Sequence, residues 1–147
     1  MEDFASEPQI HAHPMIRKSI LLFLLVVGFP FLTVHSQQLS TTSKKAEKYF
    51  YAAVDSYQAR QYDKAVTEVK KALENDNAFT EAYILQGDIY ADMQDPEMAI
   101  NSYVSAIGTN KPFSPNLYYV LGNMQLSVGR YEDARLNYMR LLEYGQL

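Results

Sequence analysis

The feature that most constrains this chain is a repeat with a period of 34 or 35 residues, which runs from about Ala46 to Leu147. Three columns of residues keep the period: one of tyrosines, one of alanines, and one in which every residue is alanine or glycine. They are Tyr49, Tyr83 and Tyr118; Ala65, Ala99 and Ala134; and Ala53, Gly87 and Gly122. A period of this length indicates stacked copies of one supersecondary unit, each of which buries its apolar side on the next.

The columns resemble the tetratricopeptide repeat, a helix–turn–helix unit of about 34 residues with small and aromatic residues at set places. The third copy carries the motif at Tyr118–Gly122 and Ala134–Tyr138. The second copy carries it at Tyr83–Tyr90 and Ala99–Tyr103, and the first, with alanines at the Leu-Gly place of the motif, diverges most.

This resemblance implies an all-α fold, a right-handed superhelical array of three tetratricopeptide-type hairpins. The repeats span residues 46–79, 80–114 and 115–147. Boundary residues divide them into six helices, expected at about 44–59, 62–75, 80–93, 96–108, 115–128 and 131–144. Asp95 and Ser114 are each expected to be an N-cap followed by proline at the first helical position. Gly129 is expected to supply the left-handed residue at a helix end.

The N-terminal part of the chain reads as a targeting segment. Within residues 15–36, Arg17 and Lys18 precede an apolar run of ten residues, and small residues precede Gln37, which is the pattern of a signal peptide cut after Ser36. A permanent anchor is the alternative, but a spanning helix needs about 20 apolar residues. Residues 1–14 are acidic and are interpreted as an upstream extension of a chain that starts at Met15. Residues 37–45 are expected to be a polar linker.

Composition excludes several functions. The chain has no cysteine, and its three histidines all precede Gln37, so the repeats lack the commonest metal ligands and the usual proton shuttle. We therefore expect no catalytic residue, no metal and no cofactor. Asp88 and Asp92, one helical turn apart, are the one pair suited to acid–base work or weak cation binding, and they lack a third partner. The net charge is −4 with scattered lysines and arginines, which argues against nucleic acid.

The first helix of each repeat lines the concave side of such arrays, where a protein or peptide partner is expected to bind. The candidate groove residues are Glu47, Phe50, Val54, Tyr57, Ile84, Asp88, Asp92, Asn116, Tyr119 and Asn123. This surface is apolar and acidic and carries no lysine or arginine, which favours a segment with apolar anchors and some positive charge. The alternative is that the aromatic residues pack against neighbouring repeats and the aspartates are only solvated.

The chain is expected to have a signal peptide, then a short linker, then three repeats. This order resembles the N-terminal part of certain Gram-negative envelope proteins. In those proteins a propeller-like segment and a peptidoglycan-binding domain like that of outer membrane protein A follow. The resemblance implies an exported scaffold in the periplasm or at the periplasmic face of the outer membrane. A small free-standing periplasmic adaptor with a chaperone-like role is the alternative.

The last predicted helix carries Ala134, Tyr138, Leu141 and Leu142 on one stripe, with Met139 beside it. An array normally covers such a stripe, because each exposed apolar side chain forgoes about 1.5–3 kcal/mol of burial. The stripe therefore predicts self-association or a further domain that packs on this helix.

Overall fold

The structure, a computed structural model, describes residues 39–109 and 113–145, all of which belong to one unit of the chain, Gln38–Leu147. The predicted extension 1–14 and signal peptide 15–36 lie outside the described residues. The described part contains six helices and no strand, which confirms the all-α class. The helices are α2 (Lys44–Gln58), α3 (Tyr62–Asn75), α4 (Thr80–Asp92), α5 (Pro96–Gly108), α6 (Asn116–Ser127) and α7 (Tyr131–Tyr144).

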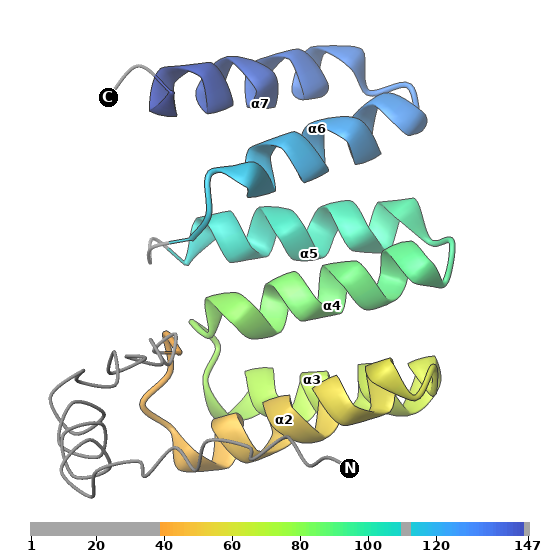
Figure 1. The fold of residues 1–147 in the computed structure, drawn as a ribbon, viewed down its shortest axis with the longest axis vertical. Helices are drawn as coiled ribbons and strands as arrows, with labels where there is room; N and C mark the ends of the chain where they lie inside the picture. Colours follow the sequence, from red (N-terminus) through yellow and green to blue (C-terminus); the bar gives the residue numbers. More distant parts are fainter. Residues whose placement is uncertain (1–38, 110–112, 146–147) are drawn as a thin grey trace, which may run out of the picture. The chain divides into compact units, whose positions relative to one another are not determined.

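Figure 1 shows these helices stacked in chain order, with each antiparallel to the next. The closest packing is within three hairpins, α2 with α3, α4 with α5, and α6 with α7. The second helix of one hairpin then packs on the first helix of the next, which makes the stack continuous. Every helix agrees with its sequence-based bounds to within one residue at each end.

Each hairpin is closed by a residue in the left-handed region of backbone space. These residues are Arg60 (φ 58°), Gln94 (φ 61°) and Gly129 (φ 79°), which occupy one column of the repeat. The next N–H in each turn donates to the carbonyl five residues earlier: Gln61 to Ser56, Asp95 to Tyr90, and Arg130 to Gln125. Gly129 is confirmed in the role predicted for it. The same conformation at Arg60 and Gln94 was not predicted, because a Cβ normally disfavours it.

The predicted helix starts are right at Asp95 and wrong at Ser114. The Asp95 carboxylate accepts a hydrogen bond from the Met98 N–H at 3.2 Å, and Pro96 follows at the first helical position. In the third repeat the cap is Pro115, so α6 begins one residue later than expected and has no side-chain cap. The Ser114 carbonyl instead accepts from the Leu117 N–H at 2.9 Å.

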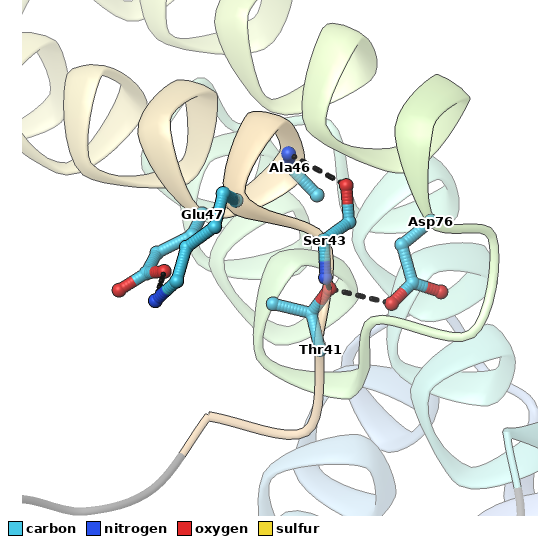
Figure 2. Close-up of polar contacts among 6 residues, drawn as sticks. Thr41, Ser43, Ala46, Glu47 and Asp76 are labelled. Carbon is cyan, nitrogen blue, oxygen red and sulfur yellow. Dashed lines mark hydrogen bonds and ion pairs between the residues drawn. The ribbon is translucent and has the colours of Figure 1, made fainter.

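Residues Leu39–Ser43, which fall in the predicted polar linker, are held against the repeats. Leu39 packs on the first core cluster, and the Thr41 hydroxyl donates to Asp76 at 2.6 Å (Figure 2). The Ser43 side chain caps α2 by accepting from the Ala46 N–H at 3.2 Å. This N-terminal segment is therefore part of the folded unit.

Ser40, in the same segment, bonds to the start of α4. Its N–H donates to both carboxylate oxygens of Glu81, at 3.1 Å each, and its hydroxyl also donates to Glu81. The Thr80 N–H in turn donates to the Ser40 hydroxyl oxygen at 3.0 Å. Because α4 has no side-chain cap of its own, Ser40 acts as its cap from about 40 residues away.

The stripe expected to lie uncovered on α7 is divided in the structure. Ala134 is buried, and Tyr138 and Leu141 are half-buried, so the expectation is wrong for Ala134 and holds only in part for the other two. Leu142 and Met139 are exposed, as expected, and so is Leu136. Self-association or a further domain at this helix stays a prediction.

Candidate partner-binding groove

A small hollow lies between α4 and α6. It encloses about 150 Å³, and most of its surface comes from these two helices. Its lining residues are Ile84, Asp88, Tyr103, Ser114, Asn116, Leu117 and Val120. We call it the α4–α6 hollow. Three apolar side chains and one carboxylate therefore meet in one concave place, as a site for a short peptide segment requires.

The carboxylate of Asp88 is oriented by a tyrosine. The Tyr103 hydroxyl, from α5, donates to Asp88 Oδ1 at 2.7 Å. Burial raises the pKa of Asp88, the hydrogen bond from Tyr103 opposes that change, and the nearby charge of Asp92 adds to it. Burial, with the charge of Asp88 beside it, also raises the pKa of Tyr103. No ion pair to Asp88 is present among the described residues, so its charge lacks a cationic partner here.

Asp92, one turn further along α4, has a similar partner in the preceding repeat. The Tyr57 hydroxyl donates to Asp92 Oδ2 at 2.9 Å and so joins α2 to α4. Burial and this bond together raise the pKa of Tyr57 to about 12, so its proton stays in place at neutral pH. Each of the two carboxylates therefore accepts a hydrogen bond from a tyrosine hydroxyl of another helix.

The structure brings together only part of the predicted groove. Ile84, Asp88 and Asn116 meet in the α4–α6 hollow, and Tyr57 meets Asp92 beside it. Phe50 and Val54 instead pack against the first core cluster, with the Phe50 ring centroid 4.9 Å from that of buried Phe79. This is the packing that the alternative interpretation expects for the aromatic residues.

The remaining predicted residues lie at the two ends of the stack. Glu47 pairs with Lys44 at 2.8 Å near the start of α2. On α6, Tyr119 is 49% exposed, and its ring centroid is 6.3 Å from that of Tyr138. Asn123 accepts from the Tyr138 hydroxyl at 2.8 Å, which repeats the contact of Asp88 with Tyr103.

Four residues of the hollow were not among the predicted groove residues: Tyr103, Ser114, Leu117 and Val120. Tyr103 is a motif residue of the second repeat and is buried in its core, but its hydroxyl end also reaches the hollow. One signal in the sequence could have located it. Tyr103 follows Gly87 by 16 residues, as Tyr138 follows Gly122, and in both pairs the ring lies directly over the glycine.

Within the described residues, no three His, Cys, Asp or Glu side chains gather where they could hold a metal ion. None of the helices in residues 39–109 and 113–145 is long and apolar enough to cross a membrane.

The comparison with known proteins agrees with the architecture. Residues 80–112, which contain α4 and α5, match the tetratricopeptide repeat family model. No curated protein matches the sequence. The structure also resembles many solved ones, several of which are tetratricopeptide proteins, so the class of fold is a tetratricopeptide-type helical array.

Three solved structures illustrate the likeness. MamA aligns with a TM-score of 0.65 and 20% identity over 69% of this chain, which spans 59% of MamA. The first tetratricopeptide domain of Spaghetti, bound to the HSP90 peptide SRMEEVD, aligns with a TM-score of 0.62 and 20% identity over 69% of this chain and 79% of its own. The third is the Yersinia enterocolitica type III secretion chaperone SycD in complex with a peptide of the translocator YopD. It aligns with a TM-score of 0.61 and 19% identity over 69% of this chain and 77% of SycD.

Proposed function

We propose that this chain is an exported scaffold that holds a segment of a partner protein against α4 and α6. The observation that carries the proposal is the α4–α6 hollow, where Ile84, Leu117 and Val120 surround the carboxylate of Asp88. An apolar side chain of the partner would fill the hollow. A lysine or arginine beside it would pair with Asp88, whose only bonded partner among the described residues is a tyrosine hydroxyl.

Two solved neighbours support peptide binding as the mode. Spaghetti was solved with an HSP90 peptide, and SycD was solved with a peptide of YopD. The HSP90 peptide SRMEEVD is acidic, however, whereas the hollow of this chain contains a carboxylate and no lysine or arginine. The proposed partner therefore differs in charge from that peptide. Nothing in the hollow suggests a reaction, and we propose no enzymatic role.

The cellular setting belongs to the proposal. Arg17, Lys18 and the apolar run after them support export, and the order of leader, linker and repeats supports a role in a cell-envelope assembly. The two alternatives for that role are a scaffold associated with the outer membrane and a small periplasmic adaptor. A reading frame that continues beyond Leu147 into a peptidoglycan-binding domain would favour the first.

The test of the groove uses labelled peptides and fluorescence anisotropy on the full chain. A peptide of alternating leucine and lysine should bind, and any binding of SRMEEVD should be unaffected by Ile84→Ser, because such binding would take place outside the α4–α6 hollow. Ile84→Ser should weaken binding about tenfold, which corresponds to about 1.4 kcal/mol. Asp88→Asn should weaken it similarly and reduce its salt dependence, because one ion pair is lost.

The matched control is Tyr131→Ser, since Tyr131 is 67% exposed and lies at the start of α7, away from the hollow. It should leave peptide affinity unchanged. Circular dichroism should show the same helix content in all variants. Weaker binding of SRMEEVD to Ile84→Ser, or no response of the leucine–lysine peptide to that variant, would contradict the proposed groove.

A further inference from the structure

A second hollow lies on another part of the array, between the second helices α5 and α7. It encloses about 240 Å³, and its lining includes Val104, Ile107, Gln125, Leu136, Asn137 and Arg140. It shares no lining residue with the α4–α6 hollow. We call it the α5–α7 hollow.

One exchange between repeats explains why this hollow has a polar floor. At the place of Gln125 the second repeat has Tyr90, a bulky side chain that is 7% exposed. At the place of Asn137 it has Ser102, which is also buried. In the third repeat the carboxamide of Gln125 therefore stands where the second repeat has an aromatic ring. The carboxamide of Asn137 stands where the second repeat has a serine hydroxyl. The result is a pair of buried carboxamides under an open space.

The carboxamide of Asn137 is not fully satisfied. Its Nδ2 donates to Gln125 Oε1 at 2.7 Å and to the Asp133 carbonyl at 3.1 Å. Its Oδ1 accepts no hydrogen bond from any described residue, although the residue is only 5% exposed. A buried acceptor without a donor destabilises a fold, so a donor that enters from the hollow would be bound favourably.

The rim of the hollow carries one available cation. Arg130 is already paired with Asp133 at 2.9 Å, which also neutralises that carboxylate. Arg140 lies over the Tyr118 ring, 5.9 Å from its centroid, and forms no ion pair with any described residue. Its charge is therefore free to meet an anion.

The walls are apolar and open to solvent. Val104 on α5 is 49% exposed and Leu136 on α7 is 47% exposed. Sites for drug-sized molecules usually enclose about 300–1,000 Å³, so a hollow of about 240 Å³ suits one or two residues of a peptide better. The site thus combines an acceptor, a cation and an apolar wall at the scale of a short peptide segment.

We propose that the α5–α7 hollow binds a partner segment in which a glutamate or aspartate side chain lies next to an apolar one. The apolar side chain packs on Val104 and Leu136, the carboxylate pairs with Arg140, and a backbone N–H donates to Asn137 Oδ1. The array then has two sites of opposite preference, this one for acidic segments and the α4–α6 hollow for cationic ones. This second site does not depend on the first.

The test is NMR titration of the ¹⁵N-labelled full chain with two probes, acetyl-Ala-Leu-Glu-Ala-amide and its glutamine counterpart. The glutamate peptide should shift the amide signals of Val104, Leu136 and Asn137, and the glutamine peptide should bind at least fivefold more weakly. Arg140→Gln should remove this difference between the probes. Because Arg140 is exposed, its replacement should leave the fold intact.

A second variant fills the hollow. Gln125→Tyr combined with Asn137→Ser copies the pair that the second repeat already accommodates, and it should abolish binding of the glutamate probe. Binding of the leucine–lysine peptide to the α4–α6 hollow should be unchanged in this variant, which separates the two proposals. Equal binding of the two probes, or absence of shifts at millimolar probe, would overturn the inference. Tighter binding of acetyl-Ala-Leu with a free terminal carboxylate would overturn it too, by assigning the hollow to chain ends.

Discussion

At the scale of single residues, the repeats are held together by pairs whose sizes compensate. A Cβ added to Gly87 would lie 2.4 Å from a ring carbon of Tyr103, and at Gly122 it would lie 2.6 Å from Tyr138. In the first repeat the same two places hold Ala53 and Val69, which are a larger and a smaller residue. The distance between paired helices therefore allows glycine opposite a tyrosine ring, or alanine opposite a smaller side chain, but not alanine opposite a ring.

This pairing predicts the effect of Gly87→Ala. In the interior of a helix, alanine is more stabilising than glycine by about 1 kcal/mol. The overlap with Tyr103 opposes that gain and costs about 1–3 kcal/mol, because the ring is buried and its hydroxyl is bonded to Asp88. We expect a net loss of about 0–2 kcal/mol in the free energy of unfolding, measured by urea denaturation.

Two further variants make that experiment decisive. Adding Tyr103→Val to Gly87→Ala recreates the Ala–Val pair of the first repeat, so the double variant should lose less stability than the two single losses combined. Gly108→Ala is the matched control, because no atom beyond its chain neighbours and its own helix backbone lies within 4 Å of the added Cβ, and the helix should gain stability. A stabilised Gly87→Ala would show that Tyr103 moves aside freely.

At the scale of elements, the start of α4 depends on a residue outside its own repeat. Phe79 precedes the helix and cannot cap it, and Ser40 supplies the missing acceptor to the Thr80 N–H. Glu81 completes the arrangement by accepting from the Ser40 N–H. The N-terminal segment thereby links the first hairpin to the second.

Ser40→Ala tests this link. Loss of a helix cap costs about 1 kcal/mol, so the free energy of unfolding should fall by about that amount. The amide hydrogens of Thr80 and Glu81 should also exchange faster with solvent, which is measurable by NMR. Thr42→Ala is the control, since Thr42 is exposed and its side chain forms no hydrogen bond with the described residues, and it should have no effect. Unchanged exchange at Thr80 in Ser40→Ala would contradict the role of Ser40.

At the scale of the whole molecule, the proposed export predicts that the leader is removed. A cut after Ser36 would leave Gln37 and Gln38 ahead of Leu39, so the contacts of the N-terminal segment would stay intact. Val34 and Ser36 are small enough for the two shallow pockets that signal peptidases present. The expected mature chain therefore begins at Gln37.

Mass spectrometry of the protein purified from its native host tests the cut. It should find Gln37 at the N-terminus, and Ser36→Leu should leave the leader attached, because leucine is too large for the second pocket. Peptides from residues 1–14 in the native host would show that translation starts at Met1, contrary to the expected start at Met15.

The sequence alone determined the helices and their pairing. Their bounds follow from local features, such as Asp95 before Pro96 and Gly129 at a turn, and their pairing follows from the columns of small residues. Of the candidate site, Ile84, Asp88 and Asn116 could be found because they lie on the first helices of adjacent repeats. These features depend on residues close together in the chain or one repeat apart, so periodicity reveals them.

Only the tertiary structure decided how side chains from different helices fill the space between them. It placed Tyr103 beneath the α4–α6 hollow, packed Phe50 on Phe79, and left the side-chain oxygen of Asn137 without a donor among the described residues. It also bound Ser40 to α4 across about 40 residues of chain. Such outcomes depend on the summed volumes and hydrogen bonds of side chains from several helices, which a repeat pattern does not encode.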